Sequence, residues 1–241
     1  MPNQMLSTTT GLLLSGGIDS AVLLDQLLRQ GTRVVPFYVR TGCVWDACEL
    51  DAVRQILGAI SAVHGRLDQL VLLDMPLEDL YGNHWSLSGE NVPDDTTADE
   101  AVFMPGRNPL LLLKPALWCQ MHGIGRLALA TLGNNPFDDA TPEFFAAFEK
   151  MLQRATGELV QVVRPFASMA KHSVLQLGRH LPLELTFSCL SPVNGMHCGV
   201  CNKCAERRLA FRQIGRDDPT CYATAGSQQS PASMASPVTR R

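Results

Sequence analysis

The chain has 241 residues, of which 46% are hydrophobic and 18% are charged, and its formal net charge at pH 7 is −3. This length suits one sizeable α/β domain with a small appendage. The acidic balance argues against non-specific nucleic-acid binding, which needs a basic face, and no segment approaches the roughly 20 apolar residues of a membrane span. The first residues, MPNQMLSTTT, lack the layout of a signal peptide, so we expect a cytoplasmic protein that does not bind a membrane.

The hydrophobic pattern alternates between strand-like and helix-like segments. Strands are expected at residues 9–14, 33–39, 67–75, 126–132 and 159–166. Helices are expected at residues 19–30, 46–64, 109–123, 142–155 and 169–180, with Pro115 placed to kink the third of them. Residues 81–108 are polar and rich in Gly, Asn, Asp and Thr, which predicts a long functional or mobile loop. Strands that alternate with helices predict a doubly wound, mainly parallel α/β sheet with helices on both faces.

Composition divides the chain into three expected parts. An α/β domain is expected over residues 8–185, and a small cysteine-rich helical subdomain over residues 186–216. Residues 217–241 are rich in Ser, Ala, Pro and Gln, which predicts a disordered tail. Because ligands of open α/β sheets bind at the carboxyl ends of the strands, we expect the site where the first domain's loops follow its strands.

The stretch Ser15-Gly16-Gly17 separates the first strand from the first helix, and Asp19-Ser20 follows within that helix. Glycines let successive backbone N–H groups converge on an anion, and the start of a helix adds unpaired N–H groups and the positive end of its dipole. The string is neither a Walker loop nor a dinucleotide-binding fingerprint. The alternative is a plain turn in which Asp19 or Ser20 caps the helix. The full string, S-G-G-x-D-S, resembles the pyrophosphate loop of the N-type ATP pyrophosphatases.

Four of the eight cysteines, Cys189, Cys198, Cys201 and Cys204, follow the pattern C-x8-C-x2-C-x2-C. Disulfides are rare in a reducing compartment, and four closely spaced thiolates suit a closed, tetrahedral Zn²⁺ site of structural type. An iron–sulfur cluster uses other spacings, and a redox Cys-x-x-Cys pair needs only two thiols. His197 is an alternative fourth ligand, although its neighbour Cys198 fits the spacing better.

Together these motifs resemble the 7-cyano-7-deazaguanine synthase family. The segment VFMPGRN (102–108) is similar to the family's V-P-G-R-N, and RPFASMAKHSVLQLGRHLPLELTFSC (164–189) to its T-P-L-x-x-L-S-K-A-E-I-V stretch and T-W-S-C ligand motif. The segment CGVCNKCAERRLAF (198–211) is close to C-G-x-C-x-x-C-x-x-R-x-x-A-F. The resemblance covers roughly residues 10–215 in the same order.

The resemblance implies an ATP-dependent carbon–nitrogen ligase that converts 7-carboxy-7-deazaguanine and ammonia to the nitrile and uses ATP, Mg²⁺ and Zn²⁺. It also implies a homodimer, and the acidic balance predicts no stable nucleic-acid partner. Catalytic roles are implied for Asp19, Ser20, Arg107 and Lys171, and substrate contacts for Arg107, Asn108 and Asp139. ATP contacts are implied for the following residues: Leu14, Ser15, Gly16, Gly17, Ile18, Asp19, Ser20, Ala21, Val22, Leu23 and Leu24. For Lys171, a solvated helix face is the competing interpretation.

Two loops at strand ends depart from the family motifs. Residues 38–45 keep little of F-D-Y-G-Q-R-H, and the segment NNPFDDATPEFF (134–145) has Ala140 and Thr141 where the family has a cysteine and an arginine. An arginine is a geometrically exacting partner for a carboxylate, so the substrate could be a different carboxylate, or the product an amide.

Two other functions remain open. A tRNA-thiolating enzyme would need a reactive cysteine outside the metal cluster, with Cys43 and Cys119 as the candidates, and a basic surface. A non-enzymatic zinc-binding module would use a basic patch at Arg207, Arg208 and Arg212.

Overall fold

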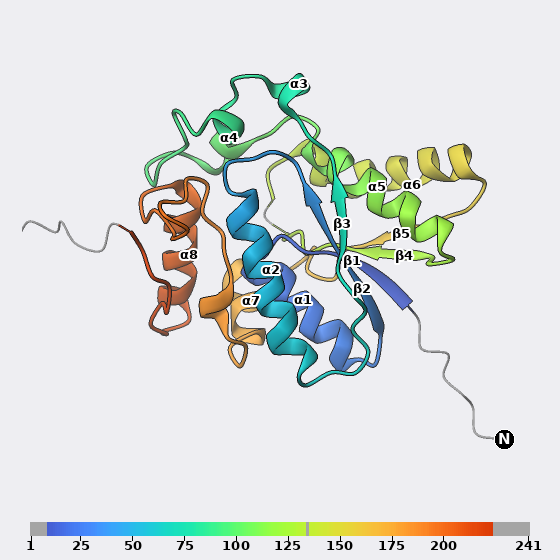
Figure 1. Ribbon diagram of the computed structural model, residues 1–241, viewed down its shortest axis with the longest axis horizontal. Coiled ribbons are helices and arrows are strands. Elements are labelled where there is room, and N and C mark those ends of the chain that lie inside the picture. The colour runs from blue at the N-terminus through green and yellow to red at the C-terminus, as the bar shows by residue number, and fades with distance from the viewer. Residues whose placement is uncertain (1–8, 134, 224–241) are drawn as a thin grey trace, which may run out of the picture.

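The computed structural model describes residues 9–133 and 135–223. Five parallel strands form one sheet in the order β3-β2-β1-β4-β5: β1 (Thr9–Leu13), β2 (Arg33–Arg40), β3 (Val71–Asp74), β4 (Arg126–Ala128) and β5 (Gln161–Val163). The chain builds outward from β1 to β3 on one side and then adds β4 and β5 on the other (Figure 1). The carboxyl ends of β1 and β4 therefore lie next to each other at the topological switch point, where such sheets bind ligands.

Helices cover both faces of the sheet, as the sequence predicts (Figure 1). One apolar core lies under α1 (Ile18–Arg29), α2 (Asp46–Ser61) and α7 (Lys171–Leu177), and the other under α5 (Arg107–Met121) and α6 (Pro142–Thr156). Alternation along β2 explains the two layers, because Val34 and Tyr38 enter the first core and Val35 and Phe37 the second. Pro115 lies inside α5, which continues without interruption to Met121. None of the described helices is long and apolar enough to cross a bilayer.

Several strands are shorter than the pattern predicts. The apolar run 126–132 pairs only as far as Ala128 in β4, and Leu129 still donates to the Val163 carbonyl at 3.1 Å before the chain leaves the sheet. Residues 129–132 then form a wall of a cavity at the strand ends. The apolar residues at the end of this run therefore line the cavity and do not extend the strand.

The long polar segment after β3 contains more local structure than expected. It holds α3 (Glu78–Tyr81), α4 (Trp85–Ser88) and a 3₁₀ turn at Asp99–Val102. Its middle is joined to the cysteine segment by main-chain bonds, from Asp95 N–H to the Val200 carbonyl and from Asn202 N–H to the Pro93 carbonyl, both 3.0 Å. We call residues 82–106 the cover segment, because it lies over the strand ends in Figure 1.

The carboxyl-terminal helix α8 (Asn202–Gln213) packs against α7 and buries Ala210 and Phe211 in the first core. The chain beyond it was expected to be disordered from residue 217, and this is wrong for residues 217–223. Tyr222 pairs with His197 in an isolated parallel bridge and donates its hydroxyl to Asp218 at 2.6 Å. The rest of the expected tail, residues 224–241, lies outside the described residues.

Candidate functional site: a nucleotide cavity beside a four-cysteine cluster

The loop at residues 14–17 is shaped by the close approach of α2. Gly16 has φ +75°, and a Cβ atom there would lie 2.7 Å from the Glu49 carbonyl oxygen. The Gly16 carbonyl in turn accepts from Phe187 N–H at 2.8 Å. A side chain at this position would be strained in conformation and blocked by backbone, so glycine is required.

Helix α1 starts at Ile18, and its N-cap residue, Gly17, provides no side-chain cap. Ser20, which was an alternative cap, instead donates its hydroxyl to the Gly17 carbonyl at 3.1 Å and accepts from Ser15 N–H at 3.3 Å. The side chains thus rigidify the loop without occupying the end of the helix. The capped-turn alternative is not what the structure shows, and the helix N-terminus is left facing a cavity.

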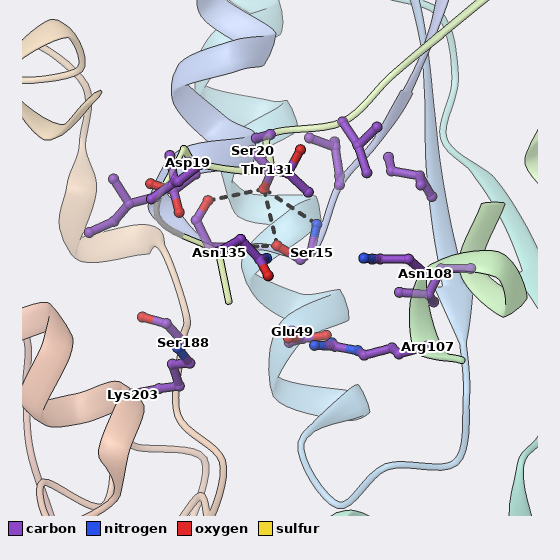
Figure 2. Close-up of a pocket in the computed structure, with 18 of the residues that line it drawn as sticks. Ser15, Asp19, Ser20, Glu49, Arg107, Asn108, Thr131, Asn135, Ser188 and Lys203 are labelled. Atoms are coloured by element: carbon purple, nitrogen blue, oxygen red, sulfur yellow. Dashed lines mark hydrogen bonds between the residues drawn. The ribbon is translucent and has the colours of Figure 1, made fainter. Parts of the chain in front are cut away.

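A cavity of about 370 Å³, the main cavity, opens at the carboxyl ends of β1, β2 and β4. Figure 2 shows polar side chains entering it from several elements, with Asp19 and Ser20 at the top, Glu49 and Arg107 below, and Lys203 at the lower left, across from Arg107. The polar and charged residues that line it are Ser15, Asp19, Ser20, Tyr38, Thr41, Glu49, Asp99, Arg107, Asn108, Thr131, Asn135, Lys171, Ser188, Lys203 and Glu206.

The expected ATP contacts divide into two groups, apart from Gly16, which is buried against α2 and does not line the cavity. Leu14, Ser15, Gly17, Ile18, Asp19 and Ser20 line the main cavity. Ala21, Val22, Leu23 and Leu24 are at most 1% exposed and belong to the core beneath it. These four support the loop from below, so the expectation that all of residues 14–24 contact the nucleotide was too broad.

A chain of ion pairs joins the loop to the cysteine-rich end of the protein. Its members are Asp19, Lys171, Glu206 and Lys203. Lys171 Nζ lies 2.6 Å from Asp19 and 3.8 Å from Glu206, and Lys203 Nζ lies 2.7 Å from Glu206. Burial opposes the charge on Lys171, but Asp19 and Glu206 outweigh it and raise its pKa. Burial likewise opposes ionisation of Glu206, but Lys171 and Lys203 hold its pKa below the usual value. Lys171 is therefore part of the cavity wall, not of a solvated helix face.

Two buried oxygens at the cavity have no hydrogen-bond partner among the described residues. They are Asp19 Oδ1, on the carboxylate whose other oxygen binds Lys171, and Thr131 Oγ1, just beyond β4. Unpaired buried polar atoms are costly and uncommon, so they indicate positions that a ligand satisfies. A carboxylate oxygen and a hydroxyl suit Mg²⁺ or a phosphate, so the residues present fit the expected nucleotide.

Arg107 and Asn108 reach the cavity from the first turn of α5 (Figure 2). The Arg107 guanidinium makes no hydrogen bond or ion pair with the described residues. Asn108 is fixed by Asp139, whose carboxylate accepts from Asn108 N–H at 3.0 Å and from its Nδ2 at 3.2 Å. Asp139 therefore positions Asn108, and its expected contact with the substrate stays a prediction.

Glu49 is a titratable group in the main cavity that the motifs did not indicate. Its carboxylate accepts from the Tyr38 hydroxyl at 3.2 Å and lies beside Arg107 (Figure 2). Burial raises the pKa of the Glu49 carboxyl to about 8, Asp46 adds to the rise, and Arg107 and the Tyr38 hydrogen bond offset only part of it. Glu49 therefore carries a proton at neutral pH.

This raised pKa predicts how stability depends on pH. An unfolded Glu titrates near pH 4.3, so between about pH 4.3 and 8 the native state holds one more proton than the unfolded state. Stability then falls as pH rises through that window. Because this slope amounts to about 3 kcal/mol between pH 5.5 and 8, we expect Glu49→Gln to remove it, so that its melting temperature drops about 7 °C less than that of the wild type over this range.

Differential scanning calorimetry at several pH values measures this effect. Glu90→Gln changes an exposed carboxyl in the same way and should follow the wild-type curve. Parallel curves for Glu49→Gln and the wild type would contradict the assignment.

The four cysteines of the predicted metal site come together in one buried cluster. All four sulfurs lie within 4.8 Å of one another, with Cys189–Cys201 and Cys198–Cys204 separations of 3.9 Å. Four sulfurs bound tetrahedrally at about 2.3 Å from a zinc ion would be about 3.8 Å apart. The geometry therefore fits zinc.

Backbone N–H groups surround the cluster. Cys189 Sγ accepts from Cys198 N–H at 3.2 Å, and Cys198 Sγ from Cys201 N–H at 3.3 Å. Such bonds stabilise thiolates, the form that binds metal. His197 lies outside the cluster, because its Nε2 accepts from Ser188 N–H at 3.2 Å and its ring packs against Phe187. The alternative in which His197 is a ligand is not supported.

Arg207 does not contribute to the expected basic patch on α8. Arg207 is 1% exposed and donates to Leu183 O at 2.8 Å, to Thr186 Oγ1 at 2.9 Å and to Thr220 Oγ1 at 2.6 Å. It holds the chain around the cysteine cluster instead of facing solvent. One of the three arginines of the binding-module alternative is therefore structural.

Sequence reasoning missed several residues of the site, including Glu49, Thr131, Lys203 and Glu206. Thr131 could have been found from its place at the end of a strand next to β1. Lys203 and Glu206 lie between or just after the cysteines, in a segment whose spacing indicates a metal site and not a cavity wall. No local signal marks Glu49, which reaches the cavity only through the packing of α2.

Comparisons with known proteins agree with the motifs. The family model described as Queuosine biosynthesis protein QueC matches residues 10–215. The chain is 30% identical over 226 residues to 7-cyano-7-deazaguanine synthase of Cupriavidus necator, which covers 88% of this chain and 96% of that protein. It is 31% identical over 214 residues to 7-cyano-7-deazaguanine synthase 1 of Desulfitobacterium hafniense, covering 86% and 94%. A solved 4-thiouridine synthetase–RNA complex with bound ATP matches with TM-score 0.48 and 20% identity, over 86% of this chain and 50% of that one.

Proposed function

The chain belongs to the family of the queuosine biosynthesis protein QueC, and from this premise we propose that it is an ATP-dependent ligase that makes 7-cyano-7-deazaguanine from 7-carboxy-7-deazaguanine and ammonia. The observation that carries the proposal is the family match over residues 10–215, which includes both the nucleotide loop and the four cysteines. The named relatives are matched over nearly their whole length.

The reaction activates the same carbon atom twice, first as a carboxylate and then as an amide. A carboxylate oxygen attacks the α-phosphorus of ATP and releases pyrophosphate, and ammonia then displaces AMP to give the amide. A second ATP activates the amide oxygen, which leaves with AMP as the nitrile forms. The protein's task is to hold the triphosphate and the acid in line and to stabilise the charge that develops on pyrophosphate.

The residues of the main cavity suit this task. The backbone of residues 15–17 and the start of α1 face the cavity and can donate to the β- and γ-phosphates. Asp19 Oδ1 and Thr131 Oγ1 are the groups that would hold Mg²⁺ or a phosphate oxygen. Bound Mg²⁺ supplies stabilisation of the negative charge on the leaving pyrophosphate. Ser20 supports the loop, while Lys171 and Arg107 bring positive charge to the reacting phosphate and carboxylate.

The four-cysteine cluster has a structural role in this proposal. Four thiolates would complete the tetrahedral coordination of zinc and leave no position for substrate or water. The cluster binds the cover segment to α8 and carries Lys203 into the cavity wall. We also extend to this chain the homodimer that the family resemblance implies, and a cytoplasmic location, where ATP and ammonia are available.

A second candidate is amide or nitrile formation on a different carboxylate. It is favoured by one observation, namely that the loops that depart from the family motifs contribute Trp45, Asn135 and Phe137 to the cavity wall. Thiolation is disfavoured, because burial raises the pKa of Cys43 and raises that of Cys119 to about 12. Neither thiol is the accessible thiolate that sulfur transfer needs.

Mass spectrometry of the products tests the proposal. We expect the purified protein with 7-carboxy-7-deazaguanine, ammonium and MgATP to form the amide and then the nitrile, with two AMP released per nitrile. A reaction without ammonium, and one with an inactive cavity variant, serve as controls. Absence of any product, where an established synthase works under the same conditions, would reject this substrate. ATP-to-AMP conversion with another carboxylate would then support the second candidate.

A further inference from the structure

A second cavity of about 180 Å³, the side cavity, opens beside the main cavity. The two share Arg107, Phe137 and Lys203 among their lining residues, so they meet at two cationic groups. Trp85, Phe103 and Met104 line the side cavity alone. The site therefore has a larger chamber at the nucleotide loop and a smaller chamber next to it.

Two pairs of aromatic rings form part of the side cavity wall. The rings of Trp45 and Trp85 are 5.7 Å apart between centroids and tilted by 33°, and those of Phe103 and Phe137 are 5.1 Å apart and tilted by 38°. Phe103 is 39% exposed, which leaves its ring available to a ligand. Aromatic faces in a small cavity are suited to a flat, conjugated ring, which they bind by stacking.

The charges at the junction of the two cavities favour an acid. Arg107 has no hydrogen bond or ion pair with the described residues, and Lys203 is paired only with Glu206. The single carboxylate in the side cavity wall, that of Asp139, is already engaged by Asn108. An anionic group at the junction would gain a guanidinium and an ammonium without meeting a free carboxylate.

Residues of both loops that depart from the family motifs line the side cavity. Trp45 lies in the divergent loop 38–45, and Asn135, Phe137 and Asp139 lie in the divergent loop after β4. The nucleotide loop follows its motif closely. Trp45, Asn135 and Phe137 also line the main cavity, so the divergent loops surround the junction at which the acid would meet the nucleotide.

We propose that the side cavity is the acid-binding site of this enzyme, in which a planar, bicyclic heteroaromatic ring lies among Trp85, Phe103 and Phe137. The carboxylate of that acid is held at the junction by Arg107 and Lys203, facing the nucleotide loop. This inference rests on the proposed function for the identity of the acid. It assigns specificity to Trp85, Phe103 and Phe137, and it adds Lys203 to Arg107 as a group that binds the carboxylate.

Intrinsic fluorescence tests the inference without requiring turnover. The chain has three tryptophans, of which Trp45 and Trp85 line the side cavity, while Trp118 stacks on His122 elsewhere on α5. We expect 7-carboxy-7-deazaguanine, added without ATP, to quench the fluorescence saturably. The quench should persist in Trp118→Phe and shrink in Trp85→Phe.

The half-saturating concentration of the acid in that titration is then compared between the wild type and variants of the side cavity. We expect Phe103→Ala to raise it about tenfold and Phe103→Tyr to restore it, because a stacked ring is lost and then replaced. Lys203→Met should raise the half-saturating concentration of the acid by a similar factor. It should not change the half-saturating concentration of the same ring compound without its carboxylate. Phe144→Ala removes a phenyl ring away from both cavities and should have no effect.

An unchanged half-saturating concentration in Phe103→Ala and Lys203→Met, or no quench at any acid concentration, would overturn the inference. These results are distinct from failure of the proposed function. An enzyme that forms nitrile with unaltered KM for the acid in both variants would retain its function and lose this site assignment. An enzyme that binds the acid as described but forms no product would retain the site and lose the function.

Discussion

Asp19→Asn is expected to lower kcat about 10³-fold while leaving the protein folded and its cysteine cluster intact. Asp19 Oδ1 is buried and unpaired at the cavity, and Oδ2 lies 2.6 Å from Lys171 Nζ. The amide has a similar shape but no charge, so it cannot neutralise Lys171 or hold Mg²⁺ as a carboxylate does. Loss of several kcal/mol of charge stabilisation in the transition state corresponds to a factor of this size.

Steady-state kinetics measures the loss of kcat. Isothermal titration with a non-hydrolysable MgATP analogue measures the change in nucleotide binding. Asp25→Asn is the matched control, because Asp25 lies on the same helix, is also buried, and pairs with Arg29 and His180 away from the cavity. That variant should lose stability and keep kcat. Near-normal turnover in Asp19→Asn would exclude a direct role of this carboxylate in the reaction.

Cys201→Ser is expected to produce the largest loss of stability. Its Sγ is buried 3.9 Å from that of Cys189 and accepts from Leu190 N–H at 3.4 Å, so the residue is central to the cluster. Metal binding at a structural zinc site contributes directly to the free energy of folding. We expect a loss of at least about 4 kcal/mol, which lowers the melting temperature by about 10 °C in a chain of this size.

Metal analysis by mass spectrometry, together with calorimetry, checks this result, with one zinc per chain expected in the wild type. Cys221→Ser is the matched control, since Cys221 is exposed and lies outside the cluster. It should retain both zinc and melting temperature. If Cys201→Ser melted normally with its metal in place, the structural role of the cluster would be wrong.

The parts of the fold that sequence predicts best are those fixed by local pattern. Periodicity located the five strands and five of the helices, and the alternation of strand and helix was enough to predict a parallel sheet with two covered faces. The four cysteines were identified by spacing alone, because a metal knuckle is a local structure. The string at residues 15–20 was likewise interpretable, since the loop and the helix that build it are adjacent in sequence.

Other parts depend on packing between distant segments, which no local pattern encodes. The pairing of Lys171 with Asp19 joins residues 152 positions apart, and Glu49 is protonated because α2 buries it beside Tyr38. The apolar run after β4 was taken as strand, although its second half lines the cavity. Polarity in the cover segment suggested an unstructured loop, whereas its polar groups bond to the cysteine segment.

The attachment of the cover segment uses main-chain groups, through Asp95 N–H and the Pro93 carbonyl. Main-chain bonds do not depend on which side chains the segment carries. Residues such as Phe103 can therefore be exchanged over evolutionary time while the segment keeps its position above the strand ends. Main-chain groups attach the cover segment, and its side chains select the acid. Substitutions in the segment could therefore change which acid is accepted while the sheet and the cysteine cluster stay the same.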